Sequence, residues 1–203
     1  LERCKQMITG SAVQTLIPFL AAFLAVASSS ASVASENIRV LIGDGLSSIS
    51  LQSSAGLLVE GSSQKQTEKK LTVHAASVHG PVRIRSRGGS LQMNGKAFRG
   101  TIEIRKKRSG RLLVINDLDL ESYLLGVVAA EIPADWELEA LKAQAVASRT
   151  YVVSAQRHPE HNADVCTTSH CQKWKRVDPV VAPEVFRALT ETWGMVALYD
   201  GKL

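Results

Sequence analysis

The stretch Asp117–Tyr151, DLDLESYLLGVVAAEIPADWELEALKAQAVASRTY, contains the clearest structural pattern in the chain. Its periodicity predicts two consecutive helices that are separated at Pro133, because proline disrupts the interior of a helix. In the first helix, apolar side chains recur three and four residues apart, as they do on a helix face that packs against a core. These apolar side chains belong to Leu120, Tyr123, Leu124, Val127 and Val128.

The next position of this apolar series is occupied by Glu131. Burying a carboxylate is costly unless the group is paired, protonated or used in chemistry. Two interpretations stay open from the residues alone. Glu131 is either a catalytic carboxylate or a structural one that caps the following helix or pairs with Arg149.

The second helix is expected to begin near Asp135, whose side chain is suited to capping a helix N-terminus. Its helical spacing places Ala143 and Ala147 on one face, where small side chains allow another helix to approach closely. Lys142 and Arg149 are seven residues apart and therefore share a face. Periodicity alone favours solvent exposure for both cations.

The region upstream of these helices, residues 35–114, consists of short alternating runs separated by glycine-containing turns, which is typical of β-structure. Its clearest hairpin pairs TIEIRKK with RLLVIN. Downstream, a helix is expected from Pro183, followed by a strand over Met195–Tyr199. The sequence thus predicts an α+β fold. A β-rich N-terminal part precedes a helical core with further short strands, residues 115–203, whose C-terminal end is expected to be truncated.

The first 34 residues are expected to form a signal peptide. An apolar run, Leu16–Val26, follows Arg3 and Lys5, and small residues precede a cleavage point after Ala34. The run is shorter than the roughly 20 residues that span a bilayer. The sequence therefore predicts an exported protein of the periplasm or cell envelope, which an uncleaved signal would leave anchored in the membrane.

The composition is that of a globular protein, with 45% hydrophobic and 21% charged residues and a formal net charge of +5. Dense Lys/Arg blocks with interleaved aromatic residues are missing from the sequence, which argues against a nucleic-acid-binding protein. The mild positive charge suits a polyanionic partner such as a cell-wall polymer.

A polar, irregular segment after the second helix holds Cys166 and Cys171, the two cysteines that remain once the signal is removed. Three interpretations stay open. A zinc site would use Cys166, His170 and Cys171 with His161, or else His158, as the fourth ligand. A Cys166–Cys171 disulfide is natural in an oxidising compartment, and free thiols are the third possibility. Four protein ligands would leave zinc no open position, so its role would be structural.

Three stretches together resemble the stage II sporulation protein D family, also called the amidase-enhancer family. They are ESYLLGVVAAEIPADW, ALKAQAVASRTYV and DVCTTSHCQKW, and the resemblance covers about Leu112 to Trp174. It implies a peptidoglycan lytic transglycosylase whose catalytic domain is residues 115–203. Such an enzyme cleaves glycan strands between N-acetylmuramic acid and N-acetylglucosamine and leaves a 1,6-anhydro end. Some family members are expected to carry zinc at the cysteine-containing segment.

The resemblance assigns the role of catalytic acid to Glu131 and implicates Lys142 and Arg149 in activity. A general acid must hold its proton near neutral pH, and an apolar setting favours the protonated form of a carboxyl group. Three further polar side chains are predicted to contact substrate: Gln144, Tyr151 and Gln172.

A non-catalytic function is the alternative. Members described as enhancers stimulate an N-acetylmuramoyl-L-alanine amidase, which requires binding and no chemistry. The expected partners are therefore peptidoglycan glycan strands and, in this alternative, a cell-wall amidase. A zinc hydrolase is disfavoured because the sequence has no HExxH motif or comparable three-ligand set.

Overall fold

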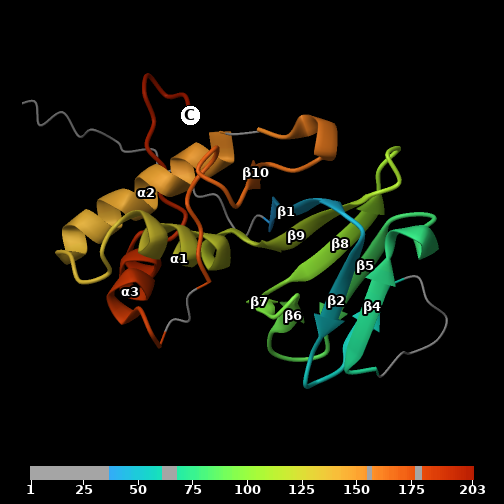
Figure 1. The fold of residues 1–203 in the computed structure, drawn as a ribbon. Coiled ribbons are helices and arrows are strands. Elements are labelled where there is room, and N and C mark those ends of the chain that lie inside the picture. Colours follow the sequence, from blue (N-terminus) through green and yellow to red (C-terminus); the bar gives the residue numbers. More distant parts are fainter. Residues whose placement is uncertain (1–36, 61–67, 155–156, 177–179) are drawn as a thin grey trace, which may run out of the picture.

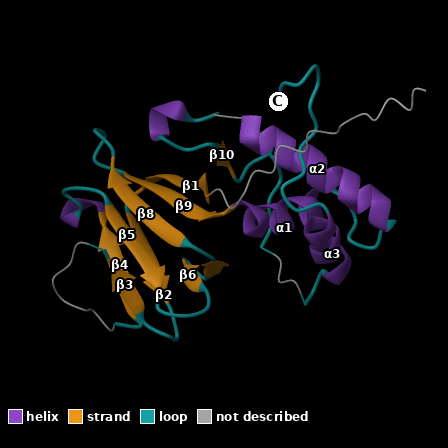
Figure 2. Cartoon of the chain, turned by 180° about the vertical axis from the view of Figure 1, so that it is seen from behind, coloured by secondary structure: helices purple, strands orange, loops and turns teal. Residues whose placement is uncertain are grey.

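The computed structural model describes residues 37–60, 68–154, 157–176 and 180–203. The helices gather on one side of the molecule and most of the strands on the other (Figures 1 and 2), which confirms the predicted α+β class. The predicted signal peptide lies outside the described residues. No helix within the described ranges is long and apolar enough to cross a membrane.

The strands form two sheets. The larger has the order β10-β1-β9-β8-β5-β3, in which β1 runs parallel to β10 and the other neighbours are antiparallel. The smaller sheet is antiparallel, with the order β4-β2-β6-β7. The strands are β1 (Asn37–Leu46), β2 (Ser48–Gln52), β3 (Leu57–Val59), β4 (Lys70–His74), β5 (Val82–Ser86), β6 (Leu91–Met93), β7 (Lys96–Phe98), β8 (Thr101–Lys106), β9 (Leu112–Asp119) and β10 (Val165–Cys166).

Apolar side chains from both sheets pack into one core. Alternate residues of β2 and β8 are at most 1% exposed, as expected for strands with one buried face: Ile49, Leu51, Ile102 and Ile104. The predicted hairpin is confirmed, because β8 and β9 pair antiparallel on either side of a tight turn. Gly110 in that turn has a φ of 76°, a conformation that favours glycine.

Strand β9 joins the strand part to the helical part. The predicted division between residues 114 and 115 falls inside this strand. Val114 packs in the core shared by the two sheets, whereas Leu118 packs in the helical core. Asp119 then caps the first helix, its side chain accepting the N–H of Ser122 at 2.8 Å. The two parts are therefore continuous through one buried strand.

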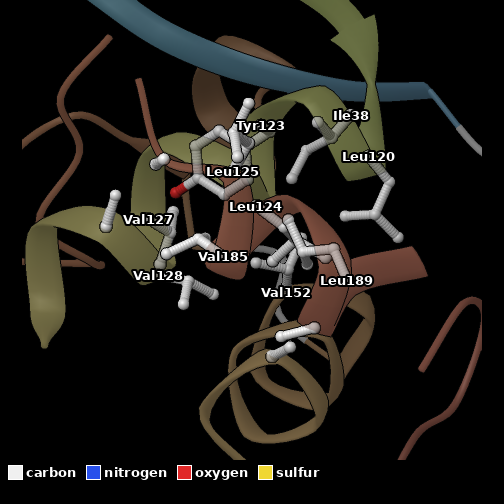
Figure 3. Packing of buried hydrophobic residues seen from close by; sticks show 14 of the residues in the cluster. Ile38, Leu120, Tyr123, Leu124, Leu125, Val127, Val128, Val152, Val185 and Leu189 are labelled. Atoms are coloured by element: carbon white, nitrogen blue, oxygen red, sulfur yellow. The ribbon is translucent and has the colours of Figure 1, made fainter. Parts of the chain in front are cut away.

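The helical part consists of α1 (Leu120–Glu131), α2 (Leu138–Ser154) and α3 (Pro183–Glu191). The predicted break at Pro133 is confirmed, and the predicted apolar series of α1 is at most 5% exposed. Two short 3₁₀ turns complete the fold, Ala75–Ser77 and Pro159–His161. Figure 3 shows side chains from all three helices converging in one core, among them Leu124, Val128, Val152, Val185 and Leu189.

Helix α2 differs from its prediction in two respects. It begins at Leu138, so Asp135 lies outside it and does not cap it. Its buried face is not the predicted alanine stripe, since Ala143 and Ala147 are exposed. The larger Leu141 and Val152 face the core instead, because they bury more apolar area than alanine can.

The predicted strand over Met195–Tyr199 is wrong. These residues are irregular, and only Tyr199 forms a bridge, to Lys202 across a tight turn. The turn itself, at Asp200–Gly201, occurs where the sequence predicts it. The backbone N–H of Ala197 bonds the hydroxyl of Thr150 instead of a neighbouring strand.

Candidate functional site

Glu131 is the last residue of α1 and is half-buried. Its Oε1 accepts the backbone N–H of Lys173 at 2.7 Å, while Oε2 accepts no hydrogen bond from the described residues. The carboxylate neither caps α2 nor pairs with Arg149. Glu131 therefore ties α1 to the segment after the cysteines with one oxygen and leaves the other free for a ligand.

The segment that contacts Glu131 continues along α1. The N–H of Lys175 donates to the carbonyl oxygen of Gly126 at 3.3 Å, and the indole of Trp174 lies directly over the same glycine. A Cβ at position 126 would overlap Trp174 Nε1 and stand 2.5 Å from the Lys175 carbonyl oxygen. Trp174 also stacks on Phe98 of β7, with ring centroids 5.9 Å apart. This close approach requires a glycine at position 126.

Tyr123 is fully buried, and its hydroxyl has no hydrogen-bond partner among the described residues. Burial raises the pKa of this phenol, and nearby groups reinforce the effect: Cys171, Cys166, Tyr151 and Glu131. The hydroxyl thus lies within electrostatic reach of both Glu131 and the cysteines. Sequence periodicity identified Tyr123 only as a core residue, because its polar neighbours come from distant segments.

Two of the predicted substrate-binding side chains meet at Ser148. Gln144 Nε2 donates to the Ser148 hydroxyl at 3.0 Å, and Gln172 Nε2 lies 3.5 Å from the Ser148 carbonyl oxygen. Gln172 is 9% exposed, and its Oε1 has no partner among the described residues. Tyr151 is half-buried beneath the guanidinium of Arg157, 5.2 Å from the ring centroid. Substrate contact by these side chains stays a prediction.

Arg149 is fully buried, contrary to the exposure that helical periodicity favours. Its guanidinium forms a bidentate pair with Glu121 of α1, with N–O distances of 2.8 and 2.7 Å, and donates to the Met195 carbonyl oxygen at 2.9 Å. These contacts fasten α1, α2 and the segment after α3 together. A contribution of Arg149 to activity would therefore be indirect.

Lys142 lies on the same side of α2 as Arg149, as its spacing predicts. Its ammonium group pairs with Glu139 at 2.8 Å and with Glu191 of α3 at 2.6 Å. No contact joins Lys142 to Glu131 among the described residues. The catalytic role that the resemblance gives to Lys142 stays a prediction.

Two histidines and two cysteines converge beside β10: His158, Cys166, His170 and Cys171. Their ligand atoms all lie within 4.8 Å of one another. Sγ of Cys171 is 3.4 Å from His158 Nε2 and 3.5 Å from His170 Nδ1. Tetrahedral zinc with its usual bond lengths holds neighbouring ligand atoms about 3.5–3.8 Å apart. Donor types and spacing therefore fit a four-ligand zinc site.

His158 completes this cluster in place of the predicted His161. The 3₁₀ turn and the bridge between His158 and Ala163 bring the His158 ring to Cys171. His161 Nε2 instead lies 3.5 Å from a Glu160 carboxylate oxygen. The sequence could not choose between the two histidines, because the choice depends on how the turn between them folds.

The two cysteines are unbonded in this structure, with their sulfur atoms 3.4 Å apart. Burial opposes ionisation of Cys166, but hydrogen bonds from Thr168 outweigh it and lower the pKa of this thiol. Burial raises the pKa of Cys171. A bound metal would require both cysteines to be deprotonated, since metals bind the thiolate form.

Two hollows adjoin this region. The larger, of about 790 Å³, and the smaller, of about 440 Å³, share Ile42, Gly43 and Thr167 in their walls. Three residues of the Cys/His cluster line the smaller hollow: His158, Cys166 and His170. The cluster thus borders a depression whose wall shares three residues with that of the larger hollow.

Comparison with known proteins relates part of this sequence to a family. Residues 108–199 match the family described as Stage II sporulation protein. Stage II sporulation protein D of Bacillus subtilis is 54% identical over 39 residues, and that of Bacillus amyloliquefaciens is 51% identical over 39 residues. Each alignment covers 19% of this chain and 11% of the relative.

A longer alignment exists with an uncharacterised protein of Brachyspira hyodysenteriae, 38% identical over 97 residues. It covers 45% of this chain and 25% of the relative, so the chain matches a quarter or less of the length of these relatives. The matched family region contains Glu131, the Cys/His cluster and all three helices. Residues 108–199 of the chain are therefore similar to the stage II sporulation protein D family.

Proposed function

We propose that this chain is an exported lytic transglycosylase that cleaves peptidoglycan glycan strands between N-acetylmuramic acid and N-acetylglucosamine, with Glu131 as the general acid. The observation that carries the proposal is the setting of Glu131. The Lys173 N–H holds one carboxyl oxygen at 2.7 Å, and the described residues leave the other without a hydrogen-bond donor. A fixed carboxylic acid with one free oxygen can pass its proton to an entering ligand.

In the proposed reaction, Glu131 donates its proton to the glycosidic oxygen while the bond from that oxygen to C1 breaks. The 6-hydroxyl of the same muramic acid forms the new bond to C1, and its proton passes to the Glu131 carboxylate. The products are a 1,6-anhydro end and a new hydroxyl on the released sugar. One carboxyl group suffices, whereas most hydrolytic glycosidases use two.

Arg149 and Lys142 serve this reaction as positioning residues in the proposal. Arg149 fixes α1 through Glu121, and Lys142 fixes α2 to α3 through Glu191. The first contact holds α1, the helix that ends at Glu131, and the second joins the two helices that pack against α1. Three polar side chains are proposed to contact the glycan: Gln144, Tyr151 and Gln172.

A structural zinc ion is part of the proposal. Bound by four protein ligands, zinc would crosslink the segment without offering an open coordination position. Cys171 precedes Lys173 by two residues, so the crosslink would brace the backbone N–H that holds Glu131. Elemental analysis is expected to give one zinc per chain, lost in Cys171→Ser and retained in His161→Ala. Zinc loss in His161→Ala with retention in His158→Ala would contradict this ligand set.

The proposed role of Glu131 is tested on purified glycan strands stripped of peptides. We expect Glu131→Gln to release cleavage products at least about a hundredfold more slowly than the parent chain. Glutamine keeps the acceptor for the Lys173 N–H, so the local fold is preserved. Glu137→Gln makes the same chemical change at an exposed site and should leave the rate unchanged.

If the parent chain binds strands without cleaving them, the enzyme proposal fails. A function as a non-catalytic enhancer of a wall amidase would then account for the binding. If Glu131→Gln cleaves as fast as Glu137→Gln, the acid lies elsewhere.

A further inference from the structure

The larger hollow, of about 790 Å³, lies where the strand part meets residues 174–176. Its volume is within the range of small-ligand sites, roughly 300–1,000 Å³. Figure 1 shows β6 and β7, which supply part of its wall, on the side of the strand part that faces α1. Six of its lining residues are apolar or aromatic: Ile42, Leu46, Met93, Ala97, Phe98 and Trp174.

The charge in this hollow is entirely positive. Lys96, Lys175 and Arg176 line it, and none of the described lining residues is acidic. Within the described ranges, these three cations form no ion pair with a carboxylate. Lys107, by contrast, is neutralised by Asp44 at 2.7 Å. The hollow therefore offers three unneutralised cations beside an apolar, aromatic wall.

The hollow is connected to Glu131 through one short segment. The backbone N–H of Lys173 donates to Glu131. Two residues later, the N–H of Lys175, a residue that lines the hollow, donates to the carbonyl oxygen of Gly126. Gly126 and Glu131 are five residues apart on α1, or about 7.5 Å. A ligand that occupies the hollow and extends along this segment would reach the carboxyl group of Glu131.

We propose that this hollow binds the carboxylate-bearing sugar rings of an acidic glycan whose next linkage lies at Glu131. The cations Lys96, Lys175 and Arg176 bind the sugar carboxylates. The apolar wall, with the edge of Trp174, faces the ring hydrogens, and Asn94 and Thr167 offer hydrogen bonds to hydroxyl groups. The identity of the ligand rests on the proposed function, whereas the preference for anions follows from the charges alone.

A glycan explains the lining better than a nucleic acid does. Bases need exposed aromatic faces on which to stack. Phe98 is only 5% exposed, and its ring stacks on Trp174 with planes 9° apart, so one face of each ring is covered within the protein. Most of the lining comes from residues 42–98, outside the matched family region. The site thus gives the strand part a function of its own.

The test measures binding without cleavage, in the Glu131→Gln background of the full chain. Two ligands of equal length are compared by calorimetry at low salt: a peptide-free muramic-acid-containing strand and a neutral oligomer of N-acetylglucosamine. Lys96→Ala/Lys175→Ala/Arg176→Ala is expected to lose about tenfold in affinity for the acidic strand and little for the neutral oligomer. Lys70→Ala is the matched control, because β4 and β7 lie at opposite edges of the smaller sheet.

Equal loss for both ligands, no loss in the triple variant, or no binding of the acidic strand would overturn the proposal. Tighter binding of a single-stranded oligonucleotide than of the acidic strand would overturn it as well. If the parent chain does not cleave but the charge-dependent binding is present, the hollow is supported and the lytic activity is not. The two proposals can therefore fail independently.

Discussion

The helical part and the strand part both hold an acidic side chain against arginine, but with different numbers of partners. In the helical part, Glu121 and Arg149 form a single pair whose guanidinium is completely buried. In the strand part, Glu103 is 3% exposed and pairs with three partly exposed arginines: Arg39, Arg83 and Arg105. Arg39 and Arg83 also pair with Asp117.

The two arrangements should differ in how well they tolerate the substitution of a charged residue. Removing one member of an isolated, largely buried pair leaves a charge that has no second partner and little access to water. In the shared cluster, the remaining charges keep partners and can be reached by water. The helical part, which contains the family motif and Glu131, is therefore the more sensitive of the two.

The largest expected effect is that of Arg149→Met. Because Glu121, whose side chain is only 11% exposed, would lose its guanidinium partner, we expect the free energy of unfolding to fall by about 3–5 kcal/mol. Urea denaturation followed by circular dichroism measures it. The double variant Glu121→Met/Arg149→Met should recover most of the loss, since an apolar pair of similar size can replace a buried ion pair. A single variant as stable as the parent chain would contradict the buried pair.

A smaller effect is expected at Gly126, where the helical part contacts the segment between Glu131 and the hollow. Gly126→Ala forces Trp174 and the Lys175 carbonyl away from α1, which should cost about 1–3 kcal/mol of stability. The displaced segment should also slow the proposed glycan cleavage, because Lys173 would no longer hold Glu131. Trp174 fluorescence and cleavage rate measure the two consequences. Ala129→Gly, on the same helix, should lower stability without shifting the fluorescence.

The smallest effect of the three is expected for Glu103→Gln, about 1–2 kcal/mol, because glutamine retains an acceptor and the arginines stay solvated. This substitution also tests pH dependence. Burial opposes ionisation of Glu103, but Arg39 and Arg105 outweigh it and hold its pKa below the usual value.

Because the pKa of Glu103 is lower in the folded chain than in the unfolded chain, its carboxylate stabilises the fold at pH values above the unfolded-state pKa. This stabilisation is lost as the pH falls through the folded-state pKa. As the pH falls below about 5, the free energy of unfolding should therefore decrease more steeply for the parent chain than for Glu103→Gln. Thermal melts across this range measure it. Parallel curves for the two proteins would contradict the shared cluster.

Local sequence signals were sufficient for much of the fold. The apolar series from Leu120 to Val128 predicts the buried face of α1, Pro133 predicts the break before α2, and alternation around Gly110 predicts the hairpin. Each of these features is decided by neighbours within a few residues. The position of Glu131 at the end of the apolar series was likewise visible in the sequence.

Features that depend on distant partners could not be predicted in this way. Arg149 is buried because Glu121, 28 residues earlier, supplies a matching carboxylate. His158 replaces His161 because of the intervening turn, and Lys173 meets Glu131 only after the chain returns along α1. The hollow is assembled from β1, β6, β7 and residues 174–176, whose adjacency no local pattern encodes.

The proposed intramolecular transglycosylation by Glu131 is tested most directly by the mass of the new glycan ends formed in ¹⁸O-labelled water. The parent chain is expected to produce ends that are lighter by one water than hydrolysis products and free of ¹⁸O, and Glu131→Gln is expected to produce essentially none. New ends that carry ¹⁸O would show that water attacks C1, and unchanged product formation by Glu131→Gln would show that another group donates the proton. Either result would contradict intramolecular transglycosylation with Glu131 as the acid.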